Sequence, residues 1–235
     1  MNFKILTLFP EVFPGPFNQS IMGKALKKKL YTIKTFDIRE FSTSKSKTVD
    51  DKPYGGGGGM VIKPDVLQKA FNFVKKDLGK KFLPIFLTPS GKKLDNEVIK
   101  RINEFNNIII ICGKYEGIDA RFVEHNNIEE ISIGDYVLSG GEIASFILID
   151  ACVRLIPEVL GNKNSLNSES FQNHLIEHPH FTKPQDWLGK KVPDVLLNGD
   201  HKKISDWRLK ESIEKTKKVR PDLYKIYKKK IKGDK

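Results

Sequence analysis

The ten residues IGDYVLSGGE, at positions 133–142, join two apolar segments of different secondary-structure preference. The run before them, residues 128–133, predicts a strand, and the longer run that follows, residues 142–154, predicts a helix. Such a glycine-rich turn lets backbone N–H and C=O groups approach a ligand without side chains in the way. The glycine count alone is equally compatible with an ordinary tight connection in an α/β domain.

Five apolar runs in the first two thirds of the chain predict strands. They are mostly continuous rather than alternating, which is typical of strands buried on both faces of a parallel sheet, and they cover residues 3–9, 32–38, 84–88, 108–112 and 128–133. Helical patterns alternate with them at residues 17–29, 64–78, 95–105, 117–124 and 142–154. This alternation predicts one α/β domain over residues 1–160.

The last third of the chain has a different character. Residues 161–170, GNKNSLNSES, are polar and small, and predict a flexible linker. Residues 171–235 predict a small, mostly helical domain, with residues 205–218 as its clearest helix.

Positive charge is concentrated at the C-terminal end. The chain has a net charge of +12, and residues 201–235, with 14 Lys/Arg and 5 Asp/Glu, account for +9 of it. A nearly neutral body with a strongly basic end indicates a polyanionic partner, RNA or DNA first. A solvated lysine-rich tail is the alternative, but it accounts less well for Trp207, Arg208, Arg220 and Tyr224 in the same segment.

Several classes of protein are excluded by composition. No apolar run approaches the length of a membrane span, and residues 1–10 lack the order of a signal peptide. Cys112 and Cys152 each lie in an apolar run, which predicts buried free thiols and gives neither a zinc spacing nor a disulfide framework. The pentaglycine at residues 55–59 is neither a Walker A loop nor a Rossmann fingerprint. We expect a cytoplasmic protein.

Ten motifs in order along nearly the whole chain resemble the bacterial tRNA (guanine-N1)-methyltransferase family, the TrmD type. They are LTLFPEVF (6–13), KTVDDKPYGGGGGM (47–60), LTPSGKKL (87–94), ICGKYEGIDAR (111–121), IGDYVLSGGE (133–142), RLIPEVLG (154–161), ESF (169–171), HPHFTKP (178–184), VPDVLLNGDH (192–201) and WRLKES (207–212). Each motif alone is weak, but ten with plausible spacing are highly specific.

The resemblance implies a fold and an activity that spacing alone does not show. The fold would be of the SPOUT class, an α/β parallel sheet whose C-terminal part threads a deep trefoil knot, a rare exception to the usual connection rules. The enzyme would be a homodimer with active sites shared between subunits. It would use S-adenosylmethionine, and require Mg²⁺, to form 1-methylguanosine at tRNA position 37, where the modification maintains the reading frame.

The resemblance also implies two catalytic residues. Glu169 would be the general base, at a position where the family usually has aspartate, and Arg154 would stabilise charge at O6 or fix the carboxylate. The alternative for each is an ordinary helix-terminal charge favoured by the macrodipole. No metal ligand is assigned.

Two sets of binding residues follow from the same motifs. Those for the methyl donor are Thr88, Pro89, Gly113, Tyr115, Glu116, Gly117, Ile133, Gly134, Asp135, Tyr136, Val137, Leu138, Gly140 and Gly141. Those for the RNA are Asp50, Gly57, Gly58, Gly59, His180, Lys183, Arg208 and Lys210. For the two tyrosines core packing is the alternative, and for His180 a structural role.

Two other functions stay open on sequence alone. One keeps the knotted methyltransferase fold but acts on a different RNA nucleotide. The other is a non-catalytic RNA-binding protein with a degenerate donor pocket, which only the glutamate at position 169 favours.

Overall fold

The computed structural model describes residues 1–79, 81–160 and 169–233. The chain forms two compact units, Met1–Gly161 and Asn162–Lys235. Most of the expected linker, residues 161–168, lies outside the described residues. Within the described ranges, no helix is long and apolar enough to cross a membrane.

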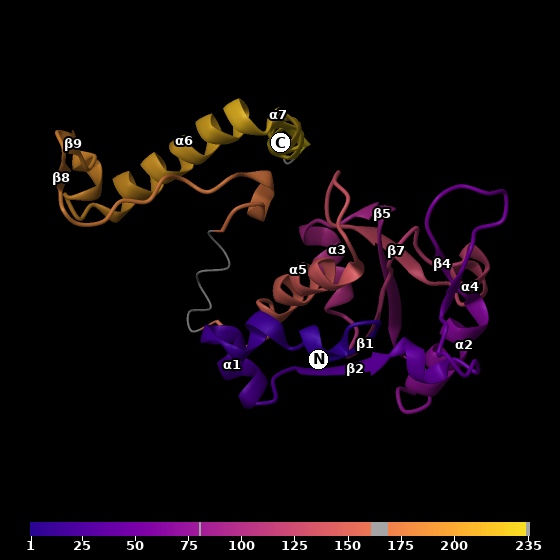
Figure 1. Ribbon diagram of the computed structural model, residues 1–235. Coiled ribbons are helices and arrows are strands. Elements are labelled where there is room, and N and C mark those ends of the chain that lie inside the picture. The colour runs from indigo at the N-terminus through magenta and orange to yellow at the C-terminus, as the bar shows by residue number, and fades with distance from the viewer. Residues whose placement is uncertain (80, 161–168, 234–235) are drawn as a thin grey trace. The chain divides into compact units, whose positions relative to one another are not determined.

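The N-terminal unit is built on a five-stranded parallel sheet (Figure 1). Its strands, in the spatial order β2-β1-β6-β5-β7, are β2 (Thr32–Asp37), β1 (Asn2–Thr7), β6 (Asn107–Cys112), β5 (Leu83–Lys93) and β7 (Glu129–Ser132). Every neighbouring pair is parallel. The five strands and the α/β class predicted from the apolar runs are therefore confirmed.

The central strands are buried on both faces, which explains why β6 is continuously apolar, whereas the edge strand β2 has no buried residue and mixes polar with apolar side chains. Along β6, Ile108 and Ile110 belong to one core cluster, whereas Ile109 and Ile111 belong to the other. The first cluster includes residues of α1 (Ser20–Lys27), α3 (Asn96–Ile102) and α5 (Gly141–Val153). The second includes residues of α2 (Pro64–Lys75) and α4 (Ala120–His125). The unit is thus a three-layer sandwich.

Aspartate caps set where two of these five helices, α3 and α4, begin. Asp95 accepts a hydrogen bond from Val98 N at the start of α3, and Asp119 accepts one from Arg121 N at the start of α4. Helix α1 is shorter than the expected 17–29, because Gly15–Asn18 forms a separate 3-10 helix, η2, before it.

The pentaglycine segment lies between two short strands that the sequence pattern did not predict. β3 (Asp50–Asp51) pairs antiparallel with β4 (Val61–Ile62), and the glycines lie in the connection. Two further 3-10 helices, η1 (Pro10–Val12) and η3 (Ile38–Phe41), follow β1 and β2.

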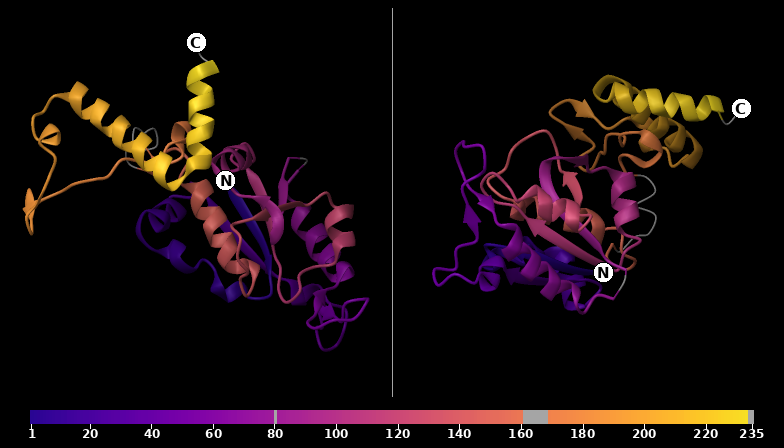
Figure 2. Two further views of the ribbon diagram at one scale, coloured as in Figure 1. Left: turned by 90° about the horizontal axis from the view of Figure 1, so that it is seen from above. Right: turned by 90° about the vertical axis from the view of Figure 1, so that its right-hand side faces the viewer.

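The C-terminal unit contains two long helices, α6 (His201–Val219) and α7 (Pro221–Gly233), which meet at a steep angle (Figure 2). Helix α6 begins four residues before the expected 205, because the Asp200 carboxylate accepts hydrogen bonds from the backbone N–H groups of Lys202 and Lys203. The remaining elements are η5 (Gln172–His174), β8 (Asp186–Trp187), β9 (Lys190–Lys191) and η6 (Asp194–Leu196).

Candidate functional site

A cleft opens at the carboxyl edge of the parallel sheet, the edge where ligands bind in open α/β sheets. It is lined by residues 86–89 within β5, by the end of β7, by the loops that follow β6 and β7, and by the start of α5. It encloses about 650 Å³ of empty space, part of it open to solvent.

Thirteen of the fourteen residues assigned to the methyl donor line this one cleft. Asp135 is the exception, because it is exposed and not among the lining residues. The cleft is also lined by residues to which no role was assigned, namely Phe86, Leu87, Lys114, Ile131, Ser132, Ser139 and Ala144. Three of these, Leu87, Lys114 and Ser139, belong to the motifs at 87–94, 111–121 and 133–142, and Ser132 directly precedes the last motif. Their position in or beside the motifs is the signal that could have identified them.

Close backbone contact joins the loop at 133–141 to the end of β6. The Gly141 N–H donates to the Gly113 carbonyl oxygen at 2.9 Å. A Cβ at position 141 would lie 2.7 Å from Cys112 Cα and 3.0 Å from Gly113 N. Only glycine fits there without moving the backbone, which accounts for the second glycine of LSGGE.

A lysine also holds this loop. Lys114 Nζ donates to the carbonyl oxygen of Ser139 at 2.6 Å and lies 5.2 Å from the centre of the Phe9 ring. Tyr136, half exposed, donates its hydroxyl to the Ile133 carbonyl oxygen at 3.3 Å. Its ring is therefore part of the loop and not of the core.

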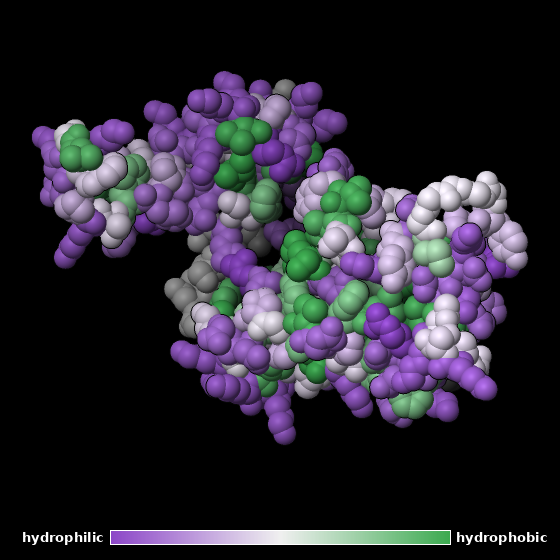
Figure 3. Space-filling model, in the orientation of Figure 1, coloured by the Kyte–Doolittle hydropathy of each residue, from purple (hydrophilic) through white to green (hydrophobic). Residues whose placement is uncertain are grey.

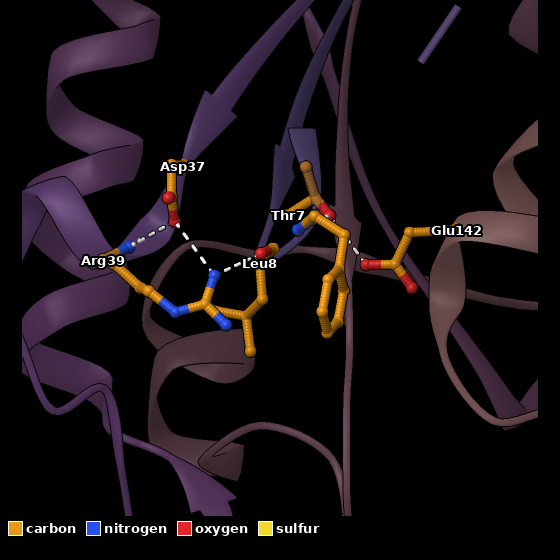
Figure 4. Close-up of polar contacts among 6 residues, drawn as sticks. Thr7, Leu8, Asp37, Arg39 and Glu142 are labelled. Atoms are coloured by element: carbon orange, nitrogen blue, oxygen red, sulfur yellow. Dashed lines mark hydrogen bonds and ion pairs between the residues drawn. The ribbon is translucent and has the colours of Figure 1, made fainter. Parts of the chain in front are cut away.

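A buried hydrogen bond ties the first strand to the start of α5 (Figure 4). Thr7 Oγ1 donates to Glu142 Oε1 at 2.6 Å, with Thr7 fully buried and Glu142 only 7% exposed. Glu142 lies in the first turn of α5, where the helix dipole favours a negative charge. Figure 4 also shows Arg39 reaching both Asp37 and the Leu8 carbonyl oxygen. These contacts fix the backbone beside the cleft.

Both cysteines are buried free thiols, as the sequence predicts. Burial first, and then the nearby Glu142 charge, raise the pKa of Cys112 well above its usual value, against the opposing effect of a hydrogen bond with Ser145. Burial raises the pKa of Cys152 to about 12. Neither thiol is therefore a nucleophile at neutral pH.

The two candidate catalytic residues belong to different units. Arg154 is half-buried at the C-terminal cap of α5, where its N–H donates to the Asp150 carbonyl oxygen. Glu169 is half-buried in the C-terminal unit and lines a hollow there with Asn173, Leu175 and His201. Their proposed cooperation stays a prediction.

The residues assigned to RNA in the N-terminal unit lie in the glycine loop at 55–59 or in β3, the strand before it. Asp50 is half-buried in β3, while Gly57 and Gly58 have open space where a side chain would be. A Cβ at Gly59 would lie 2.3 Å from Glu116 Oε1, and Met60 O accepts from Glu116 N at 3.0 Å. The loop is thereby attached to the rim of the cleft.

The other residues assigned to RNA lie in the C-terminal unit. His180, Lys183 and Arg208 line one hollow, whereas Lys210 is exposed on α6 and does not line it. His180 Nε2 lies 3.0 Å from Glu177 Oε1.

One group of three candidate metal ligands exists among the described residues. Glu177, His178 and His180 place one ligand atom each within 4.8 Å of one another. Two imidazoles do not match the all-oxygen ligand set that Mg²⁺ prefers. These residues therefore do not fit the expected magnesium ion, and no step below depends on one.

An α/β domain with a ligand cleft at the carboxyl edge of its sheet, in a chain whose second unit is helical and basic, is the arrangement expected of an enzyme that uses a small molecule and acts on a polyanion. The family model "tRNA (Guanine-1)-methyltransferase TrmD" matches residues 1–226, and the chain belongs to this family. The resemblance stated from the ten motifs is confirmed.

Curated relatives agree with this assignment. A tRNA (guanine-N(1)-)-methyltransferase of Pelagibacter ubique is 50% identical over 226 residues, covering 96% of this chain and 98% of the relative. Proteins of the same name from Ehrlichia canis and a Ruegeria species are 48% and 46% identical, each over 95% of this chain, and over 95% and 92% of their own lengths.

Proposed function

We propose that this protein transfers the methyl group of S-adenosylmethionine to N1 of guanosine 37 in tRNA, and so maintains the reading frame. One observation carries the proposal: thirteen residues that the family motifs assign to the donor line a single cleft at the carboxyl edge of the sheet. Because the family match spans both units, donor cleft and basic unit belong to one enzyme.

The reaction has two chemical requirements. N1 of guanine carries a proton at neutral pH, so a base must remove it before the nitrogen lone pair attacks the methyl group. The negative charge that develops toward O6 must be stabilised by a nearby cation. The donor is a sulfonium, already a good leaving group, so no covalent enzyme intermediate is needed.

Two residues supply these functions in the proposal. Glu169 accepts the N1 proton, and Arg154 stabilises the charge at O6 or orients the carboxylate. The donor's adenine binds among the backbone groups and apolar side chains of the loop at 133–141. Lys114 and the Thr7–Glu142 pair act indirectly, by holding that loop and the start of α5.

The basic unit supplies affinity for the RNA. Hydrophilic residues cover most of its visible face, with smaller apolar patches between them (Figure 3). Lysine and arginine contacts to phosphates bind strongly but carry little base specificity. The choice of nucleotide therefore rests with the active site.

Nucleotide mapping tests the proposed function. With labelled S-adenosylmethionine, we expect tRNA transcripts with guanosine 37 to gain one methyl group at N1, and transcripts with adenosine 37 to gain none. Methylation of the adenosine transcript at another nucleotide would favour the second enzyme hypothesis. Absence of S-adenosylmethionine binding in calorimetry would favour the non-catalytic RNA-binding protein.

We propose that the enzyme is a homodimer whose active sites use both subunits. Helix α5 packs one face on the core yet exposes 52% of Ile143 and 43% of Ile147, and exposed apolar side chains on a neighbouring pair of turns favour an interface. In sedimentation equilibrium we expect a dimer that Ile143→Glu with Ile147→Glu converts to a monomer. Phe73→Glu, at an equally exposed phenylalanine on α2, is the control that stays dimeric. A monomeric wild-type protein would contradict the proposal.

Three finer features complete the proposed function. We propose that the end of the N-terminal unit threads a trefoil knot, which the close passage of Gly141 beside Cys112 and Gly113 supports. The cytoplasm is the proposed location, because tRNA is there. Magnesium dependence is proposed from the family alone, and loss of activity on chelation is its test.

A further inference from the structure

A second hollow, in the C-terminal unit, has aromatic rings on two sides. The segment 178–183 forms one side and α6 another, and the lining is completed by Gln185, Val192, Leu196 and Leu197. The ring centroids of His178 and His180 are 4.7 Å apart, and the Trp207 centroid lies 6.3 Å from His178 and 6.2 Å from Phe181. These distances are those of a tilted aromatic cluster rather than of isolated side chains.

The residues directly before these rings are attached to α6. Ile176 N donates to Thr216 Oγ1 at 2.7 Å, and Lys215 Nζ donates to the Glu177 carbonyl oxygen at 3.2 Å. Thr216 is itself fully buried. The start of the segment that carries the rings is thus anchored before any ligand binds, which lowers the entropic cost of binding.

Packing in the core of the unit leaves these rings partly exposed. Phe181 is 45% exposed, His180 is exposed, and Trp207 is only partly buried. Core packing would have covered them, so their exposed faces are available to a flat partner.

Positive charge borders the same hollow. Lys183 and Arg208 line it, and none of its described lining residues is acidic. Exposed rings flanked by cations fit one chemical class well, an unstacked nucleobase whose adjoining phosphates meet the lysine and arginine.

We propose that this hollow binds an unstacked nucleobase of the RNA substrate, stacked against Trp207 and Phe181. The inference rests on the proposed function, which supplies the RNA. Glu169 does not line this hollow but the adjoining one, so we assign to the hollow a nucleotide that neighbours the methylated guanosine. The two hollows share His178, His180, Ile204 and Arg208.

Tryptophan fluorescence gives a direct test, because the chain contains only two tryptophans. Trp187, 60% exposed in β8, does not line the hollow. The Trp187→Phe variant therefore reports on Trp207 alone. We expect titration with an anticodon stem-loop RNA to quench its emission, whereas an RNA without the stacked base binds with little quenching.

Affinity gives the second arm. Trp207→Ala is expected to weaken RNA binding about 5–150-fold, the range for losing one base–aromatic stack, while Trp207→Phe retains most of the affinity and Trp187→Ala all of it. With the abasic RNA, the Trp207→Ala penalty should vanish. Circular dichroism verifies folding.

Three results would overturn the inference: unchanged affinity of Trp207→Ala, Trp207 emission unaffected by saturating RNA, or quenching lost only when the methylated guanosine is removed. The proposed function fails separately, if RNA binds and quenches the emission of Trp207 but the wild-type protein methylates no transcript at guanosine 37.

Discussion

Replacing Glu169 by glutamine is expected to slow methyl transfer by about 10²–10⁴-fold, the usual contribution of a general base. The amide keeps the shape of the carboxylate but cannot accept the N1 proton. Donor affinity should not change, since every described residue that lines the donor cleft belongs to the N-terminal unit and Glu169 belongs to the other. The loss therefore appears in the chemical step alone.

Single-turnover rates at saturating donor and tRNA measure that step, and calorimetry measures donor affinity. Glu169→Asp restores the family's usual residue and should preserve or raise the rate. Glu214→Gln makes the same chemical change at an exposed position on α6 and should have no effect. A Glu169→Gln rate close to wild type would show that another group takes the proton, with Asp50 the next candidate.

The sheet could be predicted because the burial of a strand is visible in the residues of that strand itself. Strands buried on both faces need apolar residues at every position, so β6 reads as four isoleucines and a cysteine in succession. No such signal marks β3, β4, β8 or β9, each only two residues long. Helix α7 was not delimited because lysines interrupt its apolar positions.

The candidate site also contains some residues that the sequence could identify and others that it could not. The donor loop is contiguous in sequence, so one motif could assign seven of its cleft residues, and the motifs at 87–94 and 111–121 could assign the other six. The bond from Thr7 to Glu142 spans 135 residues, and only the topology that places β1 beside β6 brings those two side chains together. Asp135 was assigned as a neighbour in the motif, yet in a turn adjacent side chains point in different directions.

Replacing Gly141 by alanine is expected to weaken donor binding at least about tenfold while leaving most of the fold intact. The added methyl group would lie 2.7 Å from Cys112 Cα, closer than van der Waals contact allows. The atoms nearest to this methyl group, Cys112 Cα and Gly113 N, belong to the backbone. Because β6 is fixed in the centre of the sheet, the loop at 133–141 must move instead. Overpacking of this kind costs about 1–3 kcal/mol.

The displacement breaks the hydrogen bond from Gly141 N to Gly113 O and moves the 133–141 wall of the cleft relative to the wall that follows β6. We expect affinity for S-adenosylmethionine to fall at least about tenfold, which corresponds to 1.4 kcal/mol, with a lower midpoint of thermal unfolding. Gly58→Ala is the matched control: that glycine has no positive φ and no atom within 4 Å of the added methyl group, so neither quantity should change. Donor affinity equal to wild type in Gly141→Ala would mean that the loop tolerates the shift, and that the close approach to β6 serves the fold rather than the donor.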